Sequence, residues 1–241
     1  MDSHEDSIRP GRRGSRLEIE WLGCMAFDDA RVLQEETVRQ RRAGECGDRL
    51  LLLEHPPVVT LGRGSRAENV LLSPSELEAR GIDCFEVARG GDVTYHAPGQ
   101  LVGYLVVDLA ARSRPDVGRF LRGIEGALIA ALSDLDVSAR RIPGRTGVFA
   151  GRDTTPGPDR KIASIGIGLR GWVSWHGFAL NVGIDLAGFG WIVPCGLADV
   201  QMTSIEVERT RNGGVLDPGL ESRARSCVAA SFRRWLEEGP A

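Results

Sequence analysis

The chain of 241 residues and 26.1 kDa is long enough for one large or two small domains with a buried core. Its hydrophobic content of 42% and charged content of 26% are typical of a soluble globular protein, and its net charge of −3 argues against a general nucleic-acid-binding protein. No apolar run approaches the roughly 20 residues that span a bilayer, and residues 1–15 hold no apolar segment typical of a secretion signal. We therefore expect a disordered, arginine-rich tail over 1–15 and a single cytoplasmic domain over 16–241.

The spacing of apolar residues in the first part of the chain predicts strands and helices separated by short loops. The helix expected over 28–44 has acidic residues at its start and Gly44 at its end. Ser73 and Glu76 form a capping box with Pro74 at the first helical position. The segments expected up to residue 100 are a strand over 16–23, a helix over 28–44, a buried strand over 49–55, a loop over 58–65, a short helix from Pro74 to Gly81, a strand over 82–88 and a Gly- and Pro-rich loop over 89–100.

The second part is expected to hold a buried strand, an amphipathic helix, a hairpin and a terminal helix. Asp217 is expected to cap the terminal helix, with Pro218 in its first turn. Because the order of elements lacks a regular βαβ alternation, we predict a single α+β domain. The segments expected are a strand over 101–109, a helix from Asp116 to Ala131, a hairpin over 161–182, and a C-terminal helix with an apolar stripe of Leu220, Cys227 and Trp235.

The expected hairpin has one face that is almost bare of side chains. Glycine weakens a strand, so repeated glycine indicates that a ligand or another part of the chain approaches closely, and the sequence leaves both possibilities open. The same register puts Lys161 on the apolar face at the end of the strand, unless a bulge turns it to the bare face. With Gly171 and Trp172 in the turn, the opposed pairs on the bare face are Ser164 with Ala179, Gly166 with Gly177, and Gly168 with Trp175.

Lys161 is the only lysine among the 30 basic residues of the chain. A strong coding preference for arginine could leave one lysine by chance. An amine differs chemically from a guanidinium, however, because only the amine can exchange its proton near neutral pH when its surroundings favour it. A solitary lysine is therefore a candidate general acid or base.

The five cysteines are scattered, with no CxxC pair and no metal-ligand spacing, so we expect free thiols in a reducing compartment. Cys195 differs from the others because Pro194 and Gly196 flank it, which is typical of an exposed loop. A thiol with a pKa of about 8.5 needs a neighbouring cation or base to become a nucleophile at neutral pH. Lys161 is a candidate for that neighbour.

The loop expected over 89–100 has features of a binding loop. The consecutive Gly90 and Gly91 allow backbone N–H groups to face a ligand, and Arg89 could anchor an anion or a carbonyl oxygen. The loop matches neither GxGxxG nor a Walker sequence, so it does not indicate nucleotide binding. A tight turn around a satisfied histidine would explain it equally well. The residues with hydrogen-bonding side chains are Thr94, Tyr95 and His96.

Three segments resemble the signature segments of the lipoyl(octanoyl)transferases, namely RGGDVTYHAPGQLVGYLVVDL, GVFA…RKIASIGIGLRGWVSWHGFALNV and IVPCGLADVQMTSI. The resemblance runs from about Leu50 to about Ile205 and keeps the order of the motifs. It departs at Ala97, where the family usually has glycine in HGPGQ, and this departure concerns the local loop conformation.

The resemblance implies a mixed sheet flanked by helices, as in biotin and lipoate protein ligases and class II aminoacyl-tRNA synthetase cores. It implies transfer of an octanoyl group from octanoyl-acyl carrier protein to a specific lysine of lipoyl domains, in 2-oxoacid dehydrogenase complexes and the glycine cleavage H protein, with no cofactor, metal or nucleotide. Cys195 is implied to form an octanoyl thioester, with Lys161 as its acid/base partner. The residues implied to hold the acyl substrate are Arg89, Gly90, Gly91, Asp92, Val93, Thr94, Tyr95, His96, Ser164, Ile165, Gly166, Gly177, Phe178 and Ala179.

Three other functions remain open from the sequence. A lipoate or biotin ligase would activate a free acid with ATP and Mg²⁺ and would need no nucleophilic cysteine. A cysteine hydrolase would pair Cys195 with His96 or His176 and release free octanoate. A non-catalytic lipoyl-domain-binding module would never form a covalent intermediate. None of the three explains the solitary lysine and the loop cysteine as a pair.

Overall fold

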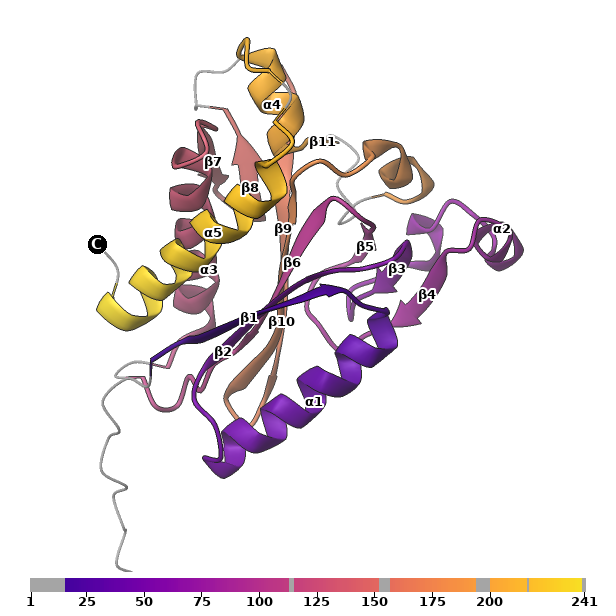
Figure 1. Cartoon of the computed structure of the whole chain (residues 1–241). Coiled ribbons are helices and arrows are strands. Elements are labelled where there is room, and N and C mark those ends of the chain that lie inside the picture. The colour runs from indigo at the N-terminus through magenta and orange to yellow at the C-terminus, as the bar shows by residue number, and fades with distance from the viewer. Residues whose placement is uncertain (1–15, 113–114, 152–156, 194–199, 216, 240–241) are drawn as a thin grey trace, which may run out of the picture.

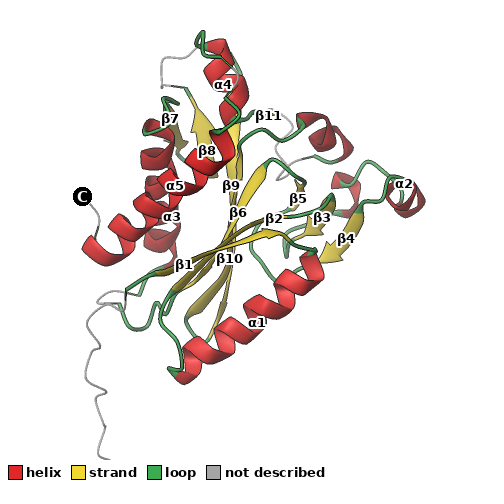
Figure 2. Ribbon diagram, in the orientation of Figure 1, coloured by secondary structure: helices red, strands yellow, loops and turns green. Residues whose placement is uncertain are grey.

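The protein folds as two β-sheets with helices packed against them (Figures 1 and 2). The computed structural model describes residues 16–112, 115–151, 157–193, 200–215 and 217–239, so the tail expected over 1–15 lies outside the described residues. The elements in chain order are β1 (Glu18–Cys24), α1 (Phe27–Ala43), β2 (Arg49–Glu54), β3 (Val58–Leu61), η1 (Ala67–Asn69), α2 (Pro74–Ala79), β4 (Asp83–Glu86), β5 (Val93–His96), β6 (Gln100–Val106), α3 (Val117–Ser133), β7 (Ala139–Ile142), β8 (Arg145–Ala150), β9 (Asp159–Arg170), β10 (Val173–Asn181), η2 (Leu186–Trp191), β11 (Val200–Met202), α4 (Ile205–Arg211), α5 (Leu220–Arg233) and η4 (Arg234–Glu238).

The larger sheet has eight strands, in the order β1-β2-β6-β10-β9-β8-β7, with β11 alongside β9. The pairs β1–β2 and β9–β11 are parallel, whereas the other neighbours are antiparallel. The smaller sheet has the order β4-β3-β5. The prediction of a single α+β domain built on a mixed sheet is confirmed.

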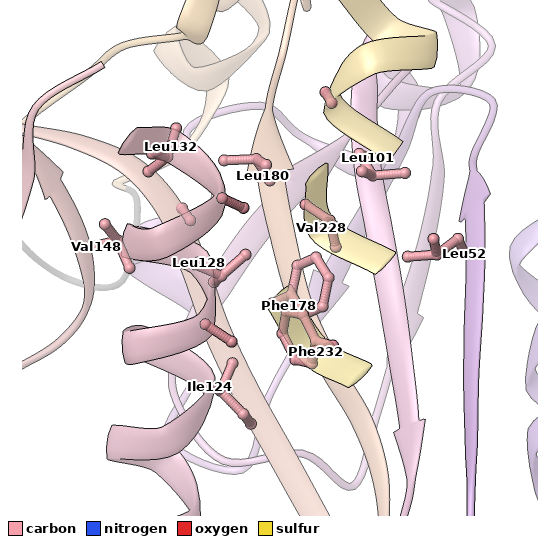
Figure 3. Packing of buried hydrophobic residues seen from close by; sticks show 14 of the residues in the cluster. Leu52, Leu101, Ile124, Leu128, Leu132, Val148, Phe178, Leu180, Val228 and Phe232 are labelled. Atoms are coloured by element: carbon pink, nitrogen blue, oxygen red, sulfur yellow. The ribbon is translucent and has the colours of Figure 1, made fainter. Parts of the chain in front are cut away.

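The two faces of the larger sheet are covered by different elements (Figure 1). Helices α3 and α5 cover one face and form the main core there, in which Leu128 and Phe232 pack toward Phe178 of β10 (Figure 3). Helix α1 covers the other face, where its Ala30 packs with Tyr104 of β6. Strands β6 and β10 lie between these layers, and every residue of both strands is buried.

The ends of the helices follow local sequence signals. α1 ends at Gly44, whose φ of 75° is a left-handed conformation that glycine adopts without strain. α2 begins with the predicted capping box, in which Ser73 and Glu76 bond each other's backbone N–H groups. α3 begins after Asp116, whose carboxylate accepts a hydrogen bond from the Arg119 backbone N–H. These three predictions are confirmed.

Two segments predicted as loops contain strands. β3 lies within the loop expected over 58–65, and β5 lies within the loop expected over 89–100. The two strands pair with each other, with Val59 opposite Tyr95, and both side chains are buried in the core of the smaller sheet. Each strand has only four residues, with proline or glycine within two positions of both ends, so these turn signals hid the strand pattern.

The terminal helix begins later than predicted. Its N-cap is Gly219, and the Asp217 carboxylate accepts a hydrogen bond from the Gly219 N–H at 3.0 Å, so Asp217 shapes the turn before the helix. No helix in the described part of the chain is both long enough and apolar enough to cross a membrane.

Candidate active site

The β9–β10 hairpin has the predicted register. Trp172 and Gly171 form its turn, and Gly166 lies opposite Gly177. The Gly168–Trp175 and Ser164–Ala179 pairs are also as predicted. The bare face of this hairpin looks away from the main core, toward the layer that holds α1 and the smaller sheet.

A cavity of about 50 Å³ lies between this face of the larger sheet and the smaller sheet. It brings together most of the residues that the resemblance implies for the acyl substrate. Three of these residues do not line it, namely Gly90, Val93 and Tyr95. Of these, Val93 and Tyr95 point into the core of the smaller sheet. The lining residues are Phe27, Thr60, Val87, Arg89, Gly91, Asp92, Thr94, His96, Val102, Tyr104, Ser164, Ile165, Gly166, His176, Gly177, Phe178 and Ala179.

The bare face is partly covered by backbone from the segment over 88–91. The Gly90 N–H donates to the Ile167 carbonyl at 2.8 Å, along the free edge of β9. A β-carbon on Gly166 would lie 2.8 Å from the Gly90 carbonyl oxygen, and one on Gly168 would lie 2.7 Å from the Ala88 carbonyl oxygen. Both possibilities left open by the sequence therefore apply. The glycines of β9 make room for the backbone of 88–91, and the cavity lies beside that backbone.

Arg89 holds the loop together through its guanidinium group. Its Nη1 donates to the Asp92 carbonyl at 2.8 Å, and its Nη2 donates to the carbonyl and hydroxyl oxygens of Thr60 at 2.8 and 2.9 Å. The planar group thus ties the loop to β3 on two sides. These contacts place Arg89 as a clamp on the cavity wall, a role that sequence reasoning did not assign to it.

For two histidines near the cavity, the hydrogen bonds show which ring nitrogen carries the proton. His55 Nδ1 donates to the Met25 carbonyl at 2.7 Å, so its Nε2 accepts from the Tyr104 hydroxyl at 2.6 Å. His96 Nδ1 donates to the Gln100 side-chain oxygen at 2.7 Å, which leaves its Nε2 as an acceptor. Burial lowers the pKa of His55 to about 4 and that of His96 to about 3, so both rings are neutral at pH 7.

Lys161 lies on the cavity face of the larger sheet because of a β-bulge. Val148 pairs with Ala163 and Phe149 with Lys161, which leaves Ile162 as the extra residue. Ile162 and Ala163 both join the main core, so the Lys161 side chain is left on the opposite face. Its Nζ lies 5.8 Å from the centre of the Phe149 ring, and Lys161 is only 2% exposed. The register without a bulge, which put Lys161 on the apolar face, is wrong.

A chain of buried hydrogen bonds links the cavity wall to the strand that carries Lys161. Beyond the His96–Gln100 bond, Gln100 Nε2 donates to Asn181 Oδ1 at 2.8 Å, and Asn181 Nδ2 donates to the Thr203 carbonyl at 2.8 Å. The Thr203 N–H in turn donates to the Lys161 carbonyl at 2.9 Å. Sequence reasoning missed Gln100, Asn181 and Thr203, since their roles depend on pairing between distant strands.

Cys195 lies outside the described residues, together with 194 and 196–199. Both flanks of that segment are described. On one side, the Val193 N–H donates to the carbonyl of Asn69, whose amide donates to the cavity residue Asp92. On the other side, Met202 of β11 pairs with Lys161. The four cysteines in the described ranges are free thiols, namely Cys24, Cys46, Cys84 and Cys227.

Comparison with solved structures defines the class of fold. A bipartite lipoate protein ligase from Thermoplasma acidophilum, solved in a study that included its E2 lipoyl domain, matches with a TM-score of 0.64 at 18% identity, over 93% of this chain and 84% of that one. The biotin protein ligase of Leishmania major in complex with biotinyl-5-AMP matches with a TM-score of 0.52 at 14% identity, over 92% of this chain and 75% of that one. The chain therefore has the fold of the lipoate and biotin protein ligases, as the resemblance implied.

Sequence comparison narrows the class. Residues 28–215 match the family model of the lipoyl protein ligase A/B catalytic domain. The octanoyltransferase of Acidobacterium capsulatum is 46% identical over 201 residues, which cover 80% of each chain. The protein belongs to the octanoyltransferases within the lipoyl protein ligase A/B family, and is accordingly an acyltransferase.

Proposed function

We propose that the protein transfers an octanoyl group from octanoyl-acyl carrier protein to a specific lysine of lipoyl domains, through an octanoyl thioester on Cys195. The acceptors are the lipoyl domains of 2-oxoacid dehydrogenase complexes and the glycine cleavage H protein. Lys161 acts as the acid and base, and the reaction uses no metal or nucleotide. The domain that does this extends over 16–241, with 1–15 as a separate tail.

The observation that carries this proposal is the position of Lys161 relative to the cavity. The implied substrate segments line a narrow cavity between two sheets, and the bulge in β9 puts the buried lysine on the same face of the larger sheet. Two residues flank the segment that contains Cys195. On one side Val193 bonds Asn69, which in turn bonds the cavity residue Asp92. On the other side Met202 pairs with Lys161. These two described flanks support the proposal that the thiol of Cys195 pairs with the amine of Lys161.

In the first step the Cys195 thiolate attacks the carbonyl carbon of the octanoyl thioester. A new C–S bond forms to Cys195, and the C–S bond to the carrier breaks. The carrier leaves as a thiolate and takes a proton from Lys161. Because one thioester replaces another, the exchange is close to isoenergetic and needs no ATP.

In the second step the amine of the acceptor lysine attacks the octanoyl-Cys195 carbonyl carbon. A C–N bond forms, the C–S bond to Cys195 breaks, and the thiolate is regenerated. The attacking amine loses a proton to Lys161, which restores the starting protonation state. Amide formation from a thioester is downhill and drives the transfer.

The proposal is tested by intact mass spectrometry after mixing the protein with octanoyl-acyl carrier protein and no ATP. We expect one octanoyl group in place of one hydrogen, located by peptide mapping on Cys195 and discharged by an added lipoyl domain. Cys195→Ala should abolish the adduct. Cys227→Ala is the matched control and should leave it unchanged. An adduct on another cysteine, or transfer that requires ATP, would contradict the proposal and favour the ligase alternative.

A further inference from the structure

His176 has an unusual backbone conformation for a strand residue. Its φ is 57°, in the left-handed region that strains a non-glycine residue. The side-chain oxygen of Gln34, a fully buried residue of α1, accepts a hydrogen bond from the His176 N–H at 2.9 Å. Ser174 bonds the backbone of β6 on the other side of this irregularity, through the Leu105 carbonyl and the Val107 N–H. The strain is therefore held by specific contacts.

The left-handed residue changes the face on which the His176 ring lies. Strict alternation along β10 would put Trp175 and Gly177 on the cavity face and His176 on the opposite one. The structure instead places the His176 ring in the cavity lining, 4.1 Å from the Trp175 ring and 6.2 Å from the Tyr104 ring. The adjacent Trp175 and His176 thus occupy the same face.

This pair of rings closes one end of the cavity. Along β9 the lining runs from Ser164 to Gly166 and stops there. At the next position on that face, a β-carbon on Gly168 would lie 2.2 Å from Trp175 Nε1 and 2.7 Å from the Ala88 carbonyl oxygen, so the space is filled. The other end of the lining points along β9 toward Lys161.

Along β10 the lining is about as long as an acyl chain of eight carbons, although the cavity of about 50 Å³ must widen to hold one. From Ala179 to His176 the strand advances by three residues, or about 10 Å at about 3.3 Å per residue. An extended eight-carbon chain with C–C bonds of about 1.5 Å spans about 9 Å. A chain with its carbonyl near Ala179 therefore reaches the His176 ring with its methyl group.

We propose that His176, held in its left-handed conformation by Gln34, is the specificity-determining residue that ends the acyl cavity and limits the substrate to medium-length chains centred on octanoyl. This role rests on the proposed octanoyl transfer. The end wall also disfavours longer chains chemically, because His176 Nε2 is a buried polar atom with no hydrogen-bond partner in the described part of the chain. A methylene group pushed against it would gain little from leaving water.

The test is the binding of free hexanoate, octanoate, decanoate and dodecanoate by calorimetry, which needs no catalysis. His176→Gly removes the ring, and glycine accepts the positive φ without strain. Each methylene newly buried adds about a factor of four in affinity. We therefore expect the ratio of decanoate to octanoate affinity to rise about fifteenfold in this variant, and Gln34→Leu to raise it by a smaller factor.

Trp172→Gly is the matched control. Trp172 is the other left-handed non-glycine residue of the β9–β10 hairpin, with a φ of 64°, but it is 46% exposed at the turn. This variant releases similar backbone strain far from the cavity, so its chain-length ratio should stay at the wild-type value. An unchanged ratio in both His176→Gly and Gln34→Leu, or an equal change in Trp172→Gly, would overturn the proposal. Chain-length-selective binding without octanoyl transfer would instead overturn the proposed function and leave this role of His176 intact.

Discussion

At the scale of single residues, the side chain of Lys161 packs tightly against Gly147 of the neighbouring strand β8. A β-carbon on Gly147 would lie 2.7 Å from Lys161 Cε and 3.3 Å from its Nζ, so the lysine side chain lies flat across that glycine. Gly147 has a φ of 126°, which keeps substitution unfavourable even apart from the contact. The amine is thus placed by the shape of the strand beside it, in a space matched to an unbranched alkyl chain.

The first prediction separates the charge of Lys161 from its proton transfer. Lys161→Ala should slow both alkylation of Cys195 by iodoacetamide and octanoyl transfer, the latter by about 10²–10⁴-fold. Lys161→Arg keeps a positive charge, so alkylation should stay closer to wild type, whereas transfer should fall as in the alanine variant because a guanidinium does not accept the proton. Both rates are measured at neutral pH, with alkylation followed on the Cys195 peptide. Near wild-type transfer by the arginine variant would show that only the charge matters.

The orientation of Lys161 shows where sequence reasoning reaches its limit. The solitary lysine was visible in the sequence, and so was the glycine pattern of its strand. Its face was not, because the bulge at Ile162 arises from pairing with β8, a strand that the sequence pattern did not predict. His176 was missed as a wall residue for the same reason, since a left-handed residue breaks the alternation on which the prediction rested.

At the scale of elements, the hairpin and the loop over 88–91 work as one unit. The loop bonds the free edge of β9, and the glycines of β9 let it approach. Gly177 serves a different contact, because a β-carbon there would lie 2.1 Å from the Gly103 carbonyl oxygen of β6. A side chain at Gly177 would therefore disturb the β6–β10 pairing itself, while one at Gly166 would displace the loop.

The second prediction follows from that difference. Gly166→Ala should lower the free energy of unfolding by about 1–3 kcal/mol, because the added methyl group must push the Gly90 backbone away. It should also weaken octanoate binding, since the same loop carries Arg89 and Asp92 of the cavity wall. Urea denaturation measures the free energy of unfolding, and calorimetry measures octanoate binding. Gly190→Ala is the control, as a β-carbon there meets no atom within 4 Å. Equal behaviour of the two variants would contradict the role given to the loop.

The longer elements were predictable because their signals are local. Caps, a left-handed glycine and apolar spacing define α1, α2 and α3, and a two-residue turn defines the β9–β10 register. The four-residue strands β3 and β5 were not predictable, because each gains its stability from the partner strand. The cavity lies between these two kinds of element, so its β9–β10 wall was foreseen as strands, whereas the facing wall was foreseen only as a binding loop over 89–100.

At the scale of the whole molecule, three of the four histidines are buried together around the cavity. Burial lowers the pKa of His55 to about 4 and the pKa values of His96 and His176 to about 3. In the unfolded chain an imidazole has a pKa of about 6.5. The unfolded state therefore binds more protons below that pH, and the stability contributed by the neutral rings is full above pH 6.5 and is lost as the pH falls toward the folded values.

The third prediction is a loss of stability in mild acid. Each of the three rings contributes up to about 1.4 kcal/mol per pH unit below pH 6.5, so lowering the pH from 7 to 5 should cost up to about 6 kcal/mol in total. Urea denaturation at a series of pH values measures this. His55→Gln should reduce the slope of unfolding free energy against pH by about one third. One of the three histidines that bind a proton on unfolding is then absent. A free energy of unfolding that stays constant between pH 7 and pH 5 would show that the rings are already hydrated in the folded protein.

The central position of β6 has a consequence for how the chain is made. All seven of its residues are buried, yet β10, which pairs with one edge, follows much later, and the Gln100–Asn181 contact joins positions 81 residues apart. At about 5–20 residues per second, ribosomal synthesis takes roughly 4–15 s to pass from the end of β6 to the end of β10. Throughout that interval the apolar edge of β6 has no native partner, whereas β2 is already available on its other side. We therefore expect this edge to be the part of the nascent chain most open to pairing with another chain during synthesis.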